Sequence, residues 1–131
     1  MTARMRLRTS FPLDPLRILL VLVAALPAAT QGAAAGDAAN GAKMYRACTP
    51  CHSLRPDVNM TGPSLAGVWG RKAGGLTSFE RYSPALKSSG VVWDDKALDT
   101  WLKDPAGFIP HNRMTFSGIK EAPARADLLA L

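Results

Sequence analysis

The run Cys48-Thr49-Pro50-Cys51-His52 holds both cysteines of this 131-residue chain and one of its two histidines. Two cysteines at this spacing can lie on one helical turn, where their sulfurs can bond the two vinyl groups along one edge of a haem. The histidine that follows can direct a neutral imidazole nitrogen at the iron. The run therefore predicts one covalent haem c, attached through Cys48 and Cys51 with His52 as an iron ligand, and a function in electron transfer.

The alternatives for these cysteines are a zinc site, a redox-active dithiol and a chance occurrence. A Cys₄ or Cys₂His₂ zinc site needs further ligands, but the chain has no third cysteine and its only other histidine is His111. A thioredoxin-type dithiol follows a buried strand, and no apolar β-branched run precedes Cys48. With so few Cys and His residues, the pattern rarely arises by chance. Haem attachment remains the favoured interpretation.

Residues 1–35 have the pattern of an export signal rather than of a folded segment. Four arginines give a basic start, an apolar core runs from Ile18 to Leu26, and Ala33-Ala34-Ala35 offers a small-residue cleavage site. The apolar core is much shorter than the roughly 20 residues of a membrane-spanning helix. An organellar transit peptide is amphipathic and lacks such a compact apolar block. We therefore predict cleavage near Ala35 and a periplasmic protein.

The mature chain, residues 36–131, is predicted to be one small domain with little net charge. The whole sequence carries +6, but residues 1–35 hold four of its 16 basic and one of its 10 acidic groups, which leaves +3. Two haem propionates would bring the total nearer to zero, and no basic run with interleaved aromatics occurs, so we expect no nucleic-acid partner. A domain of this size has a marginal core of its own, which a large buried cofactor would complete.

The sequence predicts three main helices, two of them from capping residues and apolar spacing. Asp37 can cap a short helix that leads into the haem motif, and Asp94 can cap a helix whose apolar stripe stops before Pro105. A last helix is expected from near Pro123 to the C-terminus. Ser83-Pro84 predicts one or two further helical turns.

Two long segments are predicted to be irregular. Prolines and glycines interrupt residues 53–77, and no helical pattern covers residues 105–119. Loops of this length are unusual in a compact domain unless they have something to wrap around. The fold class is therefore all-α, with three main helices and long loops around one covalent haem.

A second axial ligand could come from Met60, His111 or Met114. Met60 lies so close to His52 in the chain that it would have to turn quickly around the haem edge. His111 would give a bis-His haem, but no neighbouring carboxylate is evident that could orient its ring. Met114 lies far enough along the chain to cross to the other face, although a loop methionine can also simply fill a gap in a core.

Residues 36–131 resemble the soluble monohaem class I cytochromes c over essentially their whole length. The haem motif and the segment around Met114 are the most specific pieces. The matching pieces occur in the family's order: Cys48-Thr49-Pro50-Cys51-His52, Gly62-Pro63-Ser64-Leu65, Gly70-Arg71-Lys72-Ala73-Gly74, Tyr82-Ser83, Trp93, Trp101-Leu102, Asp104-Pro105 and Asn112-Arg113-Met114-Thr115-Phe116-Ser117-Gly118-Ile119.

The resemblance implies a cytochrome c fold and further residues for haem binding. It makes Met114 the sixth iron ligand, so that His52 and Met114 are the metal ligands. Pro63 resembles the proline whose carbonyl accepts the second ring N–H of the proximal histidine. Tyr82 and Trp93 resemble donors to a buried propionate, and Arg71 resembles the charge that offsets it.

The resemblance also assigns residues beside the methionine ligand. Trp101 corresponds to the aromatic residue on that face, and Asn112 stands where many members have Thr. The chain departs from the family where His111 replaces the glycine that usually follows the loop proline, and where Leu86 replaces a common Asn. The last residues, up to Leu131, lack the usual aromatic. These departures leave the iron ligands unchanged.

The resemblance further implies a monomeric electron carrier rather than an enzyme. Such a carrier would pass single electrons from a quinol-oxidising complex or a dehydrogenase to a terminal oxidase, and it would meet membranes only through these partner complexes. We expect exchange at a haem edge flanked by Arg113, Phe116 and Lys120. A haem enzyme or ligand-binding protein is the alternative, but it would need an open iron site, which a methionine ligand closes.

Overall fold

The computed structural model describes residues 35–131, so the predicted export signal lies outside the described residues except for Ala35. Within them no helix is long and apolar enough to cross a bilayer. The part of the chain that the structure describes is helical without strands, apart from an isolated antiparallel bridge between Lys72 and Val92. Its helices are α2 (Ala38–Tyr45), α3 (Pro84–Ser88), α4 (Asp95–Lys103), α5 (Pro105–Phe108) and α6 (Ala122–Leu129), which confirms the all-α prediction.

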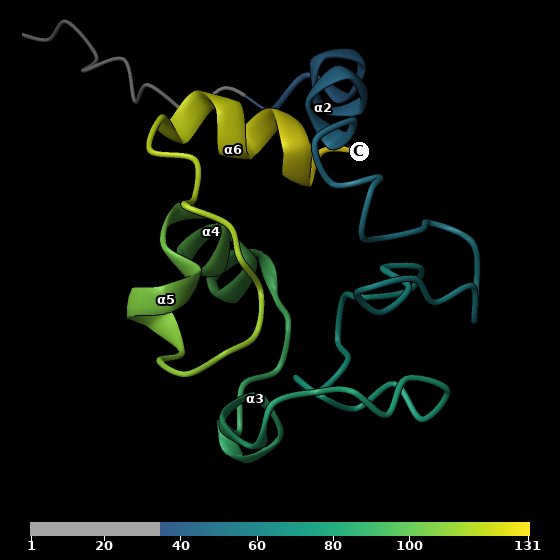
Figure 1. Ribbon diagram of the computed structural model, residues 1–131. Helices are drawn as coiled ribbons and strands as arrows, with labels where there is room; N and C mark the ends of the chain where they lie inside the picture. The colour runs from purple at the N-terminus through teal and green to yellow at the C-terminus, as the bar shows by residue number, and fades with distance from the viewer. Residues whose placement is uncertain (1–34) are drawn as a thin grey trace, which may run out of the picture. The chain divides into compact units, whose positions relative to one another are not determined.

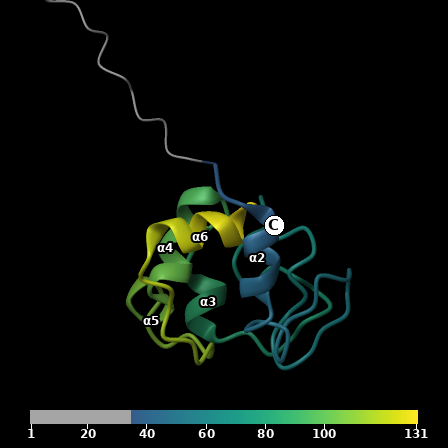
Figure 2. The same cartoon turned by 90° about the horizontal axis from the view of Figure 1, so that it is seen from above.

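Helices α2 and α6 lie side by side, although they come from the two ends of the described chain (Figures 1 and 2). Asp37 caps α2 as predicted, because its Oδ1 accepts from the backbone N–H of Ala39 at 2.8 Å. The N–H of Asp37 in turn donates to the Asp127 carboxylate of α6 at 2.7 Å. A Cβ on Gly41 would overlap the Asp127 backbone, so the close approach of the two helices requires glycine there.

Helix α4 contacts both α6 and the short helix α5 (Figure 1). Asp94 caps α4 as predicted and accepts from the Ala97 N–H at 2.7 Å. The apolar stripe of α4 buries Leu98 and Trp101. Five buried residues make up the core cluster, and the Trp93 and Trp101 rings pack edge to face within it, with centroids 5.4 Å apart. The cluster comprises Ala73, Trp93, Leu98, Trp101 and Ile109.

Residues 53–77 form loops, as predicted, and side chains hold these loops in place. Ser64 is almost fully buried, and its hydroxyl donates to the Arg55 carbonyl at 2.7 Å. Asn59 ties the loop together at two points: its amide donates to the Ser78 carbonyl at 2.8 Å, and its carbonyl oxygen accepts from the Ser64 N–H at 2.9 Å. Hydrogen bonds of this kind replace a helix or sheet ladder.

Helix α5 corrects the prediction that residues 105–119 are entirely irregular. Pro105 follows the end of α4, as predicted, but it is also the first residue of the next helix. Asp104 caps that helix through a bond from the Gly107 N–H at 3.1 Å. The last helix was expected to reach Leu131, whereas α6 ends at Leu129. The three longest helices otherwise lie where the sequence placed them, although no side chain caps the start of α6.

Candidate haem site

A cavity of about 340 Å³ is lined by the haem motif, the loops that follow it, helix α4 and the segment around Met114. Most of its exposed wall is apolar, contributed by leucine, valine, proline and aromatic side chains. All ten residues that the sequence assigned to haem binding line this one cavity: Cys48, Cys51, His52, Pro63, Arg71, Tyr82, Trp93, Trp101, Asn112 and Met114.

The haem motif forms a helical turn directly after α2. The N–H of His52 donates to the Cys48 carbonyl at 2.9 Å, and the N–H of Cys48 donates to the Tyr45 carbonyl at 2.8 Å. This turn brings both cysteines to the cavity, and they are not joined to each other by a disulfide. Before a haem is attached, burial raises the pKa of the Cys48 thiol, and the neighbouring Cys51 adds to the shift. Two cysteines three residues apart on one turn have the spacing that attachment to one edge of a haem requires.

The imidazole of His52 is oriented by two neighbouring loop residues. Its Nδ1 donates to the Pro63 carbonyl at 2.8 Å, because a carbonyl oxygen can only accept. This bond leaves Nε2 as the nitrogen available to a metal. Gly62 lies against the ring, where a Cβ would come within 2.8 Å of Nδ1. The missing side chain of Gly62 therefore gives the imidazole its space.

Replacing Gly62 by Ala should disturb the imidazole. The added methyl would overlap the His52 ring, so we expect a loss of about 1–3 kcal/mol in the unfolding free energy of the haem protein and a lower haem-to-chain ratio. Gly67→Ala is a suitable control, because Gly67 has open space around it and a φ of 61°. That variant should lose roughly 1 kcal/mol from backbone strain alone, with normal haem content. Equal haem loss in both variants would contradict this role of Gly62.

Of the three candidate second ligands, the structure brings only Met114 to the cavity. Met114 is half-buried and packs against the core cluster. Met60 is 40% exposed, and His111 is exposed as well; neither lines the cavity. A nitrogen ligand and a soft thioether therefore converge on one apolar space, a donor set that suits a six-coordinate haem iron.

Three residues with polar side-chain groups, Arg71, Tyr82 and Trp93, line the cavity. The Arg71 guanidinium donates to the Ser64 carbonyl at 2.9 Å and to the Ala66 carbonyl at 3.2 Å. Residues 35–131 contain a single ion pair, and Arg71 is not part of it. Burial raises the pKa of the Tyr82 phenol, while the charge of Arg71 acts in the opposite direction. The Arg71 cation has no carboxylate partner among the described residues, and the Tyr82 phenol stays protonated. Both groups would therefore favour the binding of an acidic group, such as a haem propionate, in the cavity.

Several lining residues were not assigned from the sequence. Leu98 and Leu102 project from the apolar stripe of α4, and Leu128 and Leu129 come from α6. The helical spacing of Leu98 and Leu102 predicts that both are buried. The sequence does not show whether such a residue packs in the core or lines a cavity. Lys120 was expected beside the haem edge, yet it does not line the cavity, and its ammonium donates to the Lys103 carbonyl at 3.0 Å.

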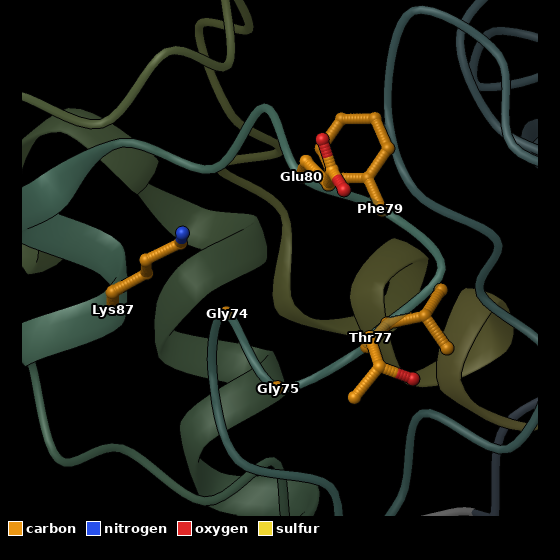
Figure 3. A pocket seen from close by; sticks show the side chains of 7 residues that line it. Gly74, Gly75, Thr77, Phe79, Glu80 and Lys87 are labelled. Atoms are coloured by element: carbon orange, nitrogen blue, oxygen red, sulfur yellow. The ribbon is translucent and has the colours of Figure 1, made fainter.

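A second hollow of about 530 Å³ lies on an open surface beside the glycine turn at residues 74–75 (Figure 3). Thr77, Phe79, Glu80 and Lys87 line it. No ion pair joins Glu80 and Lys87 in the described part of the chain, and no cluster of three metal-binding side chains occurs there. The hollow is lined by none of the residues that were assigned to haem binding, in contrast to the cavity at His52.

Known proteins with similar sequences and a similar fold point to one family. No protein-family model matches the sequence. The chain is 39% identical over 106 residues to cytochrome c2 of Blastochloris viridis, covering 80% of this chain and 83% of that protein. It is 47% identical over 83 residues to cytochrome c2 iso-2 of Magnetospirillum fulvum, covering 63% and 85%. The solved structure of cytochrome cH from Methylobacterium extorquens matches with a TM-score of 0.68 at 41% identity, over 72% of this chain and 95% of that one.

Proposed function

This chain belongs to the class I monohaem cytochromes c, and we propose that it carries single electrons in the periplasm, with His52 and Met114 as axial iron ligands. As a member of this family it carries one covalent haem c and serves as an electron carrier. The observation that supports the ligand assignment best is the convergence of His52 and Met114, and of no other candidate ligand, on one cavity.

The residues on the histidine side would attach and orient the cofactor. Cys48 and Cys51 would form the two thioether bonds, and the Nε2 of His52 would bind the iron. The Pro63 carbonyl, by accepting from Nδ1, fixes the tautomer and makes the imidazole a stronger donor. When bound, a haem supplies an iron that gains and loses one electron, and no covalent bond of the protein forms or breaks in that step.

The residues on the methionine side would set the potential and exclude water. The soft sulfur of Met114 favours the ferrous state, which raises the reduction potential. Trp93, Leu98 and Trp101 give the cavity a packed apolar wall. We assign Arg71, Tyr82 and Trp93 to a haem propionate, because Arg71 faces the cavity without a carboxylate partner among the described residues. Trp101 and Asn112 would complete the wall beside Met114.

Spectra of the native haem protein test this function. A carrier with both axial positions filled should be low-spin, with a sulfur-to-iron charge-transfer band in the oxidised form and little response of the reduced form to carbon monoxide. An enzyme or sensor with an open iron would be high-spin and would bind carbon monoxide readily. Denaturing electrophoresis with haem staining should give one haem per chain. Haem that is removed by acid-acetone extraction would contradict covalent attachment.

The periplasmic location rests on the basic, apolar and small-residue pattern of residues 1–35. Fractionation of a native host followed by intact-mass measurement should find a soluble chain that begins near Gly36 and carries one haem. Recovery of the full 131 residues in the membrane fraction would instead indicate an uncleaved anchor.

Arg81 and Arg113 place two positive charges at the mouth of the cavity. Both side chains are exposed and line it, and the Arg113 guanidinium donates to the Arg81 carbonyl at 3.3 Å. Charges at the rim of a contact surface mainly accelerate the encounter with an oppositely charged partner. We therefore propose that acidic redox partners, such as an oxidase subunit, dock over this rim.

Reversing the charge of Arg113 should slow that encounter. We expect Arg113→Glu to lower the bimolecular rate with an acidic haem-accepting oxidase subunit by about tenfold at low salt, and to weaken its salt dependence. Lys120→Glu makes the same charge change away from the cavity and should have a much smaller effect. Stopped-flow oxidation over a range of salt measures both. Equal rates in the two variants would place the docking surface elsewhere.

A further inference from the structure

The turn that precedes Met114 contains a backbone conformation that suits glycine. Pro110 and His111 occupy its centre, and the N–H of Asn112 donates to the Ile109 carbonyl at 3.3 Å across it. His111 has a φ of 64°, in the left-handed region. Proline followed by a residue with positive φ is typical of a type II turn, in which glycine is preferred at the second position. The turn is therefore strained at His111 and needs other contacts to hold it.

The side chain of Asn112 supplies those contacts. Its amide nitrogen donates to the Pro105 carbonyl at 2.9 Å and to the Ile109 carbonyl at 2.8 Å. Its carbonyl oxygen accepts from the backbone N–H of Met114 at 2.8 Å. One half-buried side chain thus joins the start of α5, the turn and the backbone of Met114.

We propose that Asn112 is a positioning residue that holds Met114 on the iron and sets how readily the sulfur gives way to a competing ligand. This inference rests on the proposed role of Met114 as axial ligand. Moving Met114 away from the cavity must open the loop, and opening the loop breaks the three bonds of Asn112. The same movement releases the strained φ of His111, so the two neighbouring residues act in opposite directions.

The opposed roles give opposite signs for two variants. Asn112→Asp keeps an oxygen for the Met114 N–H but removes both donors to the Pro105 and Ile109 carbonyls. Since each hydrogen bond contributes about fivefold, imidazole should bind the oxidised variant roughly 25-fold more tightly. His111→Gly removes the strain and should make imidazole bind roughly threefold more weakly.

Asn59 offers a matched control on the other loop. Its side chain also makes three hydrogen bonds, to the Ser78 carbonyl, the Ser78 hydroxyl and the Ser64 N–H, and it does not line the cavity. Asn59→Asp therefore removes comparable bonds without touching the loop of Met114. It should lower the denaturation midpoint of the haem protein while leaving imidazole affinity within about twofold of the parent.

The experiment titrates the oxidised holoprotein with imidazole and follows the loss of the sulfur-to-iron charge-transfer band. Tighter binding in Asn112→Asp, weaker binding in His111→Gly and no change in Asn59→Asp support the inference. A band present in the parent together with unchanged affinity in both loop variants overturns the inference alone. A parent band that is absent, or that survives Met114→Ala, overturns the ligand assignment and the inference with it. If Asn112→Asp does not hold haem, the sign of the His111→Gly effect decides.

Discussion

Replacing Met114 by His is expected to lower the reduction potential by on the order of 0.2 V, within the range of about 0.8 V that axial ligands span. Imidazole is a harder donor than a thioether and stabilises ferric iron relative to ferrous iron. Met114 is half-buried against the core and lines the cavity, so a histidine there can reach the same space. The sulfur-to-iron charge-transfer band should disappear in the same variant. Potentiometric titration followed by optical spectra measures both changes.

Met60→His provides the control for this change. Met60 is 40% exposed, does not line the cavity, and is held through its backbone carbonyl, which accepts from the Arg81 guanidinium. The same substitution there should leave the potential and the band unchanged. A band that survives Met114→His but is lost in Met60→His would falsify the assignment of Met114.

Local chemistry allowed the helix starts to be predicted from the sequence. Asp37, Ser83 and Asp94 each accept a backbone N–H two or three residues further along the chain, and a bond over so short a distance depends on few other residues. The haem motif was equally local, because its three functional side chains lie within five consecutive residues. Both kinds of prediction needed no knowledge of the rest of the fold.

Contacts between distant parts of the chain could not be predicted in this way. From the residues alone, Met60, His111 and Met114 were all candidates for the second axial ligand. Only the family resemblance favoured Met114. The structure separates them because the loop after α5 carries Met114, and not His111, to the cavity. The bonds of the Asn59 side chain to Ser78 likewise join residues 19 positions apart, and no sequence period marks them. Helix α5 was missed for a different reason, since a proline can end one helix and begin the next.

Arg125 makes further contacts between distant parts of the chain that the sequence did not reveal. Among the described charged residues, replacing Arg125 should be the most destabilising single substitution. The side chain is 6% exposed and links three segments. Its Nε donates to Asp99 of α4 at 2.6 Å, and its Nη1 donates to the carbonyls of Ile119 and Lys120 at 3.0 and 2.9 Å. Helix α6, the loop before it and helix α4 are thus joined by one guanidinium.

Arg125→Met should lower the free energy of unfolding by about 3 kcal/mol, because it leaves Asp99 and two backbone carbonyls without their partner. The lower end of the usual range for buried pairs applies, since the Asp99 side chain is 41% exposed and can be partly hydrated. Asp99→Asn should lose less, about 1 kcal/mol, because Arg125 keeps both carbonyls. Denaturant unfolding of the haem-bound protein measures these changes. Arg55→Met makes the same charge change at an exposed residue and should leave the free energy of unfolding nearly unchanged. Equal losses of stability at Arg55 and Arg125 would show that net charge, rather than the buried contacts of Arg125, stabilises the fold.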